Sequence, residues 1–202
     1  DDLLIDGDQW SVITVSVDPF SDPYFLDEPS QEVNVITMDD DVAGILLVAT
    51  DNLTSEDGDK GFFEVRLTSK PDSPVTISFS SSNLNEGTVM SEITFDSSNW
   101  DQPQLVYTTG IDDFPPVADG PQDYNITVTS IFSLDPNYGT IDPNAFDPII
   151  FTNQDNDSPA VIVKVLNDDY TTSEDLESII IGFKLTSEPN SWVDIPLSIG
   201  SK

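Results

Sequence analysis

The stretch FEVRLTSKPDSPVTISF, residues 63–79, decides the fold class of this chain. Apolar and polar residues alternate on both sides of a central turn, with Phe63, Val65 and Leu67 before it and Val75, Ile77 and Phe79 after it. Alternation with a period of two is typical of β-strands that bury one face. The intervening Lys, Pro, Asp and Ser residues favour a turn. The stretch therefore predicts two strands that follow one another along the chain.

The same pattern continues on both sides of this stretch. Further strands are expected at residues 45–49, 89–95, 104–109, 124–131 and 149–152. Clusters of turn-forming residues separate them at 55–59, 80–87, 112–120 and 134–148. No segment shows a sustained helical period. Seven short strands within about 115 residues favour an all-β, immunoglobulin-like Greek-key sandwich.

Two short peptides recur in a single register. TSED at residues 54–57 returns at 172–175, and LTSKP at 67–71 returns as LTSEP at 185–189. Nearer the N-terminus, DDD at 39–41 corresponds to DND at 155–157. Self-similarity at a fixed period indicates a repeat architecture. We expect the C-terminal part of one β-sandwich repeat at residues 1–41, a complete repeat at 42–157 and the N-terminal part of a further repeat at 158–202.

The chain is strongly acidic, with 6 Lys and Arg residues against 38 Asp and Glu residues and a net charge of −32. Such a charge repels nucleic acids and anionic membranes. It is compatible either with a solvated acidic surface or with carboxylates that bind divalent cations. The acidic residues crowd the expected loops and repeat boundaries instead of the strand faces. Their position favours cation binding.

Cysteine and histidine are both absent. Disulfides, zinc–thiolate sites and histidine bases are thereby excluded, and oxygen ligands suit Ca²⁺ better than Zn²⁺ or Cu²⁺. No apolar run is long enough to span a membrane, so we expect no membrane insertion in this segment. We also expect no enzyme, because Ser-His-Asp chemistry is impossible without histidine and the paired carboxylates recur at boundaries instead of in one cleft.

Several motifs follow one another in a familiar order: SEDG at 55–58, FEVRL at 63–67, GIDD at 110–113 and DND at 155–157. This order resembles Calx-β domains, in particular those in tandem arrays of very large surface and secreted proteins. One departure is EGTV at residues 86–89, where exchanger-type domains carry an Asp-Tyr element. The resemblance implies tandem immunoglobulin-like Greek-key β-sandwiches that bind Ca²⁺ at one end.

The resemblance also implies a set of metal ligands. In the complete repeat these are Glu56, Asp57, Asp112, Asp113, Asp155 and Asp157. Their counterparts are Asp39 and Asp41 at the first boundary, Asp1, Asp2 and Asp6 in the first part, and Glu174 and Asp175 in the third. None of these segments has the ligand spacing of an EF-hand loop, so carboxylates from different loops would have to converge.

Three Asn-x-Ser/Thr sequons begin at Asn52, Asn125 and Asn156. Asn52 and Asn125 are the expected glycosylation sites, because Asn156 precedes Ser158-Pro159 and lies among the expected metal ligands.

Together these features predict a structural extracellular module, secreted or on the cell surface, that forms a stiff rod, stalk or filament with calcium at its acidic junctions. Its expected partners are neighbouring repeats of the same chain and, in a filament, identical chains. The alternative is an adhesive domain that binds surface glycans or another ligand.

Overall fold

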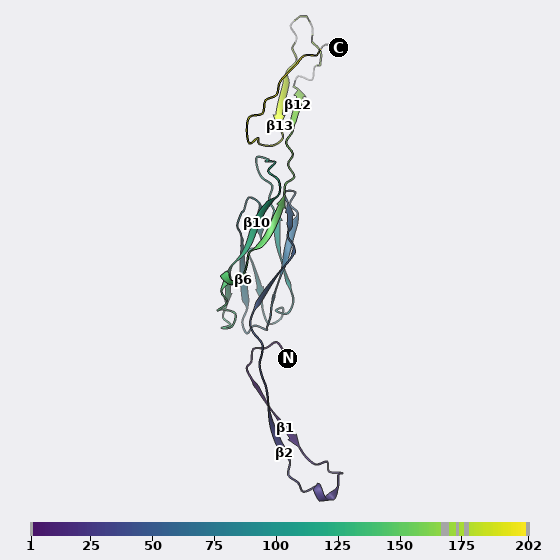
Figure 1. Ribbon diagram of the computed structural model, residues 1–202, viewed down its shortest axis with the longest axis vertical. Coiled ribbons are helices and arrows are strands. Elements are labelled where there is room, and N and C mark those ends of the chain that lie inside the picture. The colour runs from purple at the N-terminus through teal and green to yellow at the C-terminus, as the bar shows by residue number, and fades with distance from the viewer. Residues whose placement is uncertain (1, 167–169, 173, 176–177, 201–202) are drawn as a thin grey trace.

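The computed structural model describes residues 2–166, 170–172, 174–175 and 178–200. The protein is all-β and contains several sheets. It is elongated, with a central body of strands between two hairpins that extend from its opposite ends (Figure 1).

The central body consists of two sheets. The first has the strand order β4 (Leu53–Ser55), β11 (Ile149–Gln154), β10 (Gln122–Ser133), β6 (Val75–Ser81) and β8 (Glu92–Phe95). The second has the order β3 (Ile45–Asp51), β5 (Lys60–Leu67), β9 (Gln104–Gly110) and β7 (Gly87–Val89). All pairs are antiparallel except β4 and β11, which run parallel.

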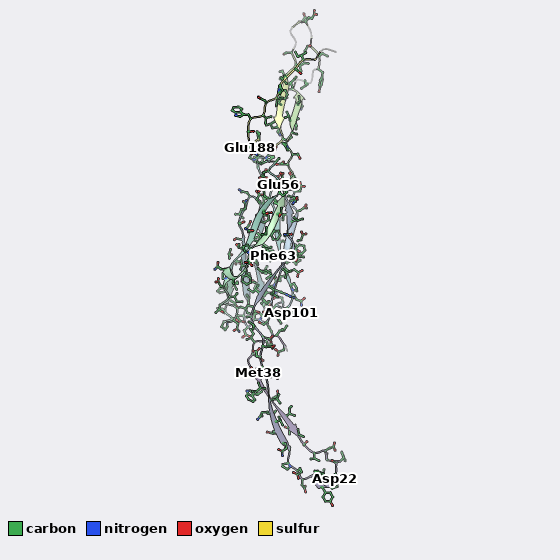
Figure 2. All side chains as sticks on the ribbon, viewed as in Figure 1. Asp22, Met38, Glu56, Phe63, Asp101 and Glu188 are labelled. Carbon is green, nitrogen blue, oxygen red and sulfur yellow. The ribbon has the colours of Figure 1, made fainter. Side chains whose placement is uncertain are left out.

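The hydrophobic core lies between these two sheets. Phe63 of β5 and Phe79 of β6 meet edge to face, with ring centroids 5.3 Å apart. The alternation in residues 63–79 is confirmed, because the apolar positions of both strands are buried and the positions between them are more exposed. Figure 2 shows Phe63 in the middle of the central body.

One expected strand is wrong, and one strand was not expected. Residues 89–95 do not form one strand: the chain breaks at Met90 and Ser91, β7 pairs with β9 in one sheet, and β8 pairs with β6 in the other. Residues 53–55, next to the expected turn, form the additional strand β4 after a register shift between Ala49 and Asp51. The alternation of apolar and polar residues predicts that one face of a strand is buried, but it does not predict which sheet the strand joins.

The two outer hairpins are thin. β1 (Gln9–Val15) pairs with β2 (Gln31–Thr37), and β12 (Val161–Val165) pairs with β13 (Ile181–Leu185). Every residue of β1 and β2 is exposed, including Val12, Ile13 and Val35. Each hairpin therefore carries apolar side chains that no second sheet covers among the described residues.

Short 3-10 turns, η1 (Pro23–Phe25) and η2 (Pro143–Ala145), are the helical elements of the described residues. None of these is long and apolar enough to cross a membrane.

Candidate functional site

Three carboxylates converge at the end of the central body from which the second hairpin extends. Glu56 follows β4, and Asp155 and Asp157 follow β11. Because β4 and β11 are parallel neighbours, their carboxyl ends meet at the same edge of the sheet. One carboxylate oxygen from each of the three residues lies within 4.8 Å of the others. We call Glu56, Asp155 and Asp157 the acidic triad; the label of Glu56 in Figure 2 marks its place.

Backbone N–H groups hold two members of the triad in place. The N–H of Asn156 donates to Glu56 Oε2 at 3.0 Å. Asp155 accepts from Gly120 N at Oδ2 and from Asp157 N at Oδ1, each at 2.6 Å. Both oxygens of Asp155 are therefore committed to backbone donors, which fixes the orientation of this carboxylate.

The third member is different. Asp157 Oδ2 is buried and has no hydrogen-bond partner among the described residues. A buried carboxylate oxygen without a donor is unfavourable, since it has lost water and gained nothing in return. The carboxylate of Asp157 also lies within range of the negative charges of Asp113, Asp155 and Asp112.

Burial and repulsion both act on the protonation of Glu56 and Asp157. Burial raises the pKa of Glu56 above its ordinary 4.5, and the charges of Asp155, Asp113 and Asp157 add to that rise, while the N–H of Asn156 opposes it. Burial likewise raises the pKa of Asp157 above 3.8, and the charges of Asp113, Asp155 and Asp112 add to that rise, while the N–H of Val117 opposes it. The site thus resists carrying its full negative charge.

Asp112 and Asp113 therefore belong to the surroundings of the triad. Both follow β9, whose last residue, Gly110, packs closely against the Ser55 carbonyl and the Asn153 side chain. A Cβ at position 110 would collide with both groups, so glycine allows the end of β9 to approach β4. Asp113 Oδ1 accepts the N–H of Val117 at 2.8 Å.

The donor atoms of the triad are all carboxylate oxygens, and such a group could hold a hard cation. Ca²⁺ takes about six to eight oxygen ligands, preferably from carboxylates, backbone carbonyls and water. The triad supplies three carboxylates, one of them with an unpartnered oxygen, and two further acids lie within electrostatic range. Among the described residues it is the one group in which three acidic side chains converge this closely.

Asp57 does not join the triad. It is exposed, and its Oδ1 accepts from Asn156 Nδ2 at 2.9 Å. A residue that sequence reasoning missed is Glu86, which lines a cavity together with Asp112 and Asp113. Its Oε2 lies 3.4 Å from Asn153 Nδ2. Glu86 is brought there by the pairing of Gly87 with Gly110, and a pairing between two distant strands leaves no local pattern in the sequence.

Asp39 and Asp41 lie at the opposite end of the central body, where the first hairpin begins. Asp39 accepts from Gly7 N at 2.7 Å and from Asp41 N at 3.0 Å, and these N–H groups, Asp41 first, lower its pKa. Burial raises the pKa of Asp41, and the charges of Asp39, Asp40 and Asp2 raise it further. Among the described residues, no third carboxylate joins these two acids as closely as Glu56 joins the triad.

Asp2 and Asp6 line one cavity together with Asp39 and Asp41. The other predicted residues lie apart from these clusters. Glu174 and Asp175 are exposed in a turn of the C-terminal part, and Asp1 lies outside the described residues. Asn52 and Asn125 are both exposed, as a glycosylation site must be. Asn52 Nδ2 donates to the carbonyl of Ile150 at 3.2 Å, so a glycan on Asn52 would have to displace or adapt this contact.

Comparison with family models, with curated proteins and with solved structures gives no significant match to this chain, so the case for its function depends on its own residues and contacts.

Proposed function

We propose that this chain is a segment of a tandem array of immunoglobulin-like, Calx-β-like sandwich repeats that forms a stiff extracellular rod, with calcium at its acidic junctions. The observation that carries the proposal is a set of hydrogen bonds that occurs twice. Gly7 N donates to Asp39 Oδ2 at 2.7 Å, and Gly120 N donates to Asp155 Oδ2 at 2.6 Å.

The duplication extends through both junctions. Asp41 N donates to Asp39 Oδ1, as Asp157 N does to Asp155 Oδ1. On the far side of each linker, Thr68 Oγ1 donates to Val42 O at 2.7 Å, and Thr186 Oγ1 donates to Ser158 O at 2.6 Å. Equivalent contacts at similar spacings, 32 and 35 residues for the Gly–Asp bond and 26 and 28 for the Thr bond, support a repeat with boundaries near residues 41 and 157.

A pair of tyrosines supports the assignment of residues 1–41 to the end of a repeat. Tyr138 is fully buried, and its hydroxyl donates to Ser69 O at 2.6 Å. Tyr24 occupies the matching position after β1 but is 92% exposed. The proposal explains the exposure of Tyr24, because the serine that it would contact belongs to earlier strands of its own repeat.

The calcium part of the proposal is supported by the acidic triad. Repulsion among Glu56, Asp155 and Asp157 and their acidic neighbours disfavours the folded end of the repeat, and a divalent cation removes that repulsion. The linker after Asp157 is short, so a cation held there would also restrict the movement of the next repeat.

Thermal unfolding of the 202-residue chain tests this function. With Ca²⁺ about 100-fold above its dissociation constant, binding to the folded state adds roughly 2.7 kcal/mol. We expect the melting temperature to rise by several degrees over that in EDTA, with Mg²⁺ as the control cation. An identical melting curve in Ca²⁺ and EDTA would contradict a calcium site. Small-angle scattering at both conditions measures the length of the rod.

A second candidate function, adhesion to a glycan or another surface ligand, is favoured by one pair of residues. Trp10 and Ile36 are cross-strand partners on the first hairpin, and both are exposed. The matching pair of the central body is Asp123 and Thr152, joined by a hydrogen bond of 2.7 Å on the solvent side of the sheet. An apolar pair in place of a polar one on an outer face is typical of a contact surface.

A glycan array with the intact chain tests this second function. Trp10→Ser should abolish binding, because aromatic rings stack on sugar faces. Trp192→Ser is the matched control, since Trp192 follows β13 of the second hairpin and is fully exposed. Binding that survives Trp10→Ser, or no binding at all, rejects this surface as a glycan site.

A further inference from the structure

We propose that consecutive repeats are locked together by a two-point joint made of protein alone, in which the loop after β5 or β13 of one repeat donates a backbone hydrogen bond to the preceding repeat. This inference rests on the proposed tandem array and specifies how its units touch.

The first joint has two attachment points. One is the covalent linker, which Thr68 holds against the central body through hydrogen bonds from Oγ1 to Val42 O at 2.7 Å and to Gly44 O at 3.3 Å. The other lies two residues beyond Thr68, where Lys70 N donates to Leu3 O at 3.0 Å. This second bond crosses from the central body to the segment that precedes the first hairpin.

The second joint repeats this arrangement. Thr186 Oγ1 donates to Ser158 O at 2.6 Å and to Ala160 O at 3.3 Å. Two residues beyond it, Glu188 N donates to Pro116 O at 2.6 Å. The label of Glu188 in Figure 2 lies between the central body and the second hairpin.

A second attachment changes the mechanics of the joint. A single tether allows the next unit to swing and to rotate about the linker. A hydrogen bond at a separate point closes a ring across the joint. The ring runs from the linker through the Thr68 hydrogen bond to Lys70 and across the Lys70–Leu3 hydrogen bond. It returns to the linker through the hydrogen bond between Gly7 and Asp39. Such a ring restrains the angle and the rotation together. Because the same ring forms at both joints, each step along the array has the same geometry, and the rod is a regular superhelix.

The contact does not depend on side-chain charge. The donor is Lys70 at one joint and Glu188 at the other, so opposite charges occupy equivalent positions while the backbone N–H is kept. Both residues precede proline, Pro71 and Pro189, and a following proline restricts a residue to extended backbone conformations. The donor N–H is therefore oriented before the contact forms.

Half-buried residues lie on the accepting side of each joint. Leu4 and Ile5 are partly covered next to Leu3, and residues 116–118 are partly covered at the second joint. Ala118 lines a cavity there together with Pro159, Val161 and Pro189. The joint therefore combines a backbone hydrogen bond with partly buried apolar residues, which a flexible linker alone would not provide.

Spin labels across the first joint test the proposal. The chain has no cysteine, so Met38→Cys and Asp101→Cys provide two unique labelling sites, both exposed. We compare three versions of the labelled 202-residue chain in EDTA: the otherwise unchanged sequence, Lys70→Pro, which removes the donor N–H, and Lys70→Glu, which imitates the second joint and keeps it. Pulsed electron paramagnetic resonance measures the distance distribution.

We expect a narrow distribution in EDTA for the unchanged chain and for Lys70→Glu, and a distribution of more than double that width for Lys70→Pro. As a second readout that needs no substitution, hydrogen exchange of the Lys70 amide should be slowed more than about tenfold relative to an unstructured peptide. This measurement decides the matter if Lys70→Pro fails to fold.

Three results would overturn the joint. A distribution that is broad in EDTA and narrow only in Ca²⁺ shows that the cation makes the joint, which leaves the calcium rod intact and removes this inference. Distance distributions of equal width for all three versions show that the Lys70 hydrogen bond does not restrain the joint. Unprotected exchange at Lys70 shows that the bond is absent. Conversely, a narrow distribution without any effect of Ca²⁺ on melting supports the joint and contradicts the calcium site.

Discussion

At the scale of single residues, the unfavourable electrostatics of the acidic triad are clearest at Asp157. One of its carboxylate oxygens is buried without a donor among the described residues, and the charges of Asp113, Asp155 and Asp112 act on its carboxyl group. In the proposed function, Asp157 destabilises the fold without a cation and becomes a ligand when a cation is bound.

Replacing Asp157 by asparagine should therefore have opposite effects in the two conditions. In EDTA, Asp157→Asn should raise the melting temperature by a few degrees, because it removes one of the repelling charges. In Ca²⁺ it should remove most of the calcium-dependent rise. Asp101→Asn, an exposed acid far from the triad, is the control and should change neither value. A lower melting temperature for Asp157→Asn in EDTA would contradict the repulsion argument.

The raised pKa values of Glu56 and Asp157 predict a pH dependence. A carboxyl whose folded-state pKa lies above its unfolded value binds protons more tightly in the folded protein, so stability falls as pH rises through that window. The loss of stability is absent when the pH lies below the ordinary pKa values, 4.5 for Glu56 and 3.8 for Asp157. It is complete when the pH lies above their raised pKa values. The pKa of Asp39 is lowered, so its stabilising contribution is lost only as pH falls below 3.8.

We therefore expect the calcium-free chain to melt at a higher temperature near pH 5 than at pH 7.5. With saturating Ca²⁺ the order should reverse, because the cation binds the ionised carboxylates. Thermal unfolding followed by circular dichroism over this pH range measures both. The double variant Glu56→Gln, Asp157→Asn should flatten the calcium-free profile; an equally steep profile in that variant would assign the effect to other acids.

At the scale of elements, Tyr138 ties the segment after β10 to the turn after β5. Its hydroxyl donates to Ser69 O at 2.6 Å and contacts Ser69 N and Oγ at 3.1 and 3.0 Å, all in a buried place. Tyr138→Phe leaves these groups unpaired and should destabilise the central body by about 1–3 kcal/mol.

Tyr24→Phe provides the matched control for Tyr138→Phe. Tyr24 holds the corresponding position in the first hairpin but is exposed, so the substitution should leave the unfolding transition unchanged. Chemical denaturation of both variants makes the comparison. A similar loss in both would mean that Tyr24 has a buried partner in solution.

The sequence predicted some elements well and others poorly. The strands β5 and β6 and their turn could be predicted because local alternation and the turn residues agree over residues 63–79. β4 and the break at Met90 could not, because both result from strands changing sheets, and strand partners are distant in the chain. The triad was predicted as part of a larger set. Asp57 fell outside it and Glu86 was missed, because loop orientation and strand register decide both.

At the scale of the whole molecule, the central body and the two hairpins differ in how they bury apolar surface. The core between the two sheets includes the fully buried residues Phe63, Ile77, Phe95 and Phe151. The hairpins are two-stranded, and isolated two-stranded hairpins are marginally stable in water. Their stability should increase toward the joints, where Gly7, Asp39 and Thr186 make their bonds.

Hydrogen exchange of the 202-residue chain should show this gradient. We expect slow exchange in β5, β6, β9 and β10, intermediate exchange next to the joints, and the fastest exchange at residues 16–30, at the far tip of the first hairpin. Mass spectrometry of peptic peptides measures it. Uniform protection from β1 to β10 would show that the hairpin's exposed face is covered in solution.

The parallel pairing of β4 and β11 has a mechanical consequence. A pulling force along the molecule enters the central body before β3 and leaves it after β11, so it draws β4 and β11 in opposite directions along their own axes. The hydrogen bonds that join Leu53, Thr54 and Ser55 to residues 152–154 are then loaded in shear and must break together instead of one at a time. The strand pair that assembles the acidic triad would thus also have to separate before the central body could be extended.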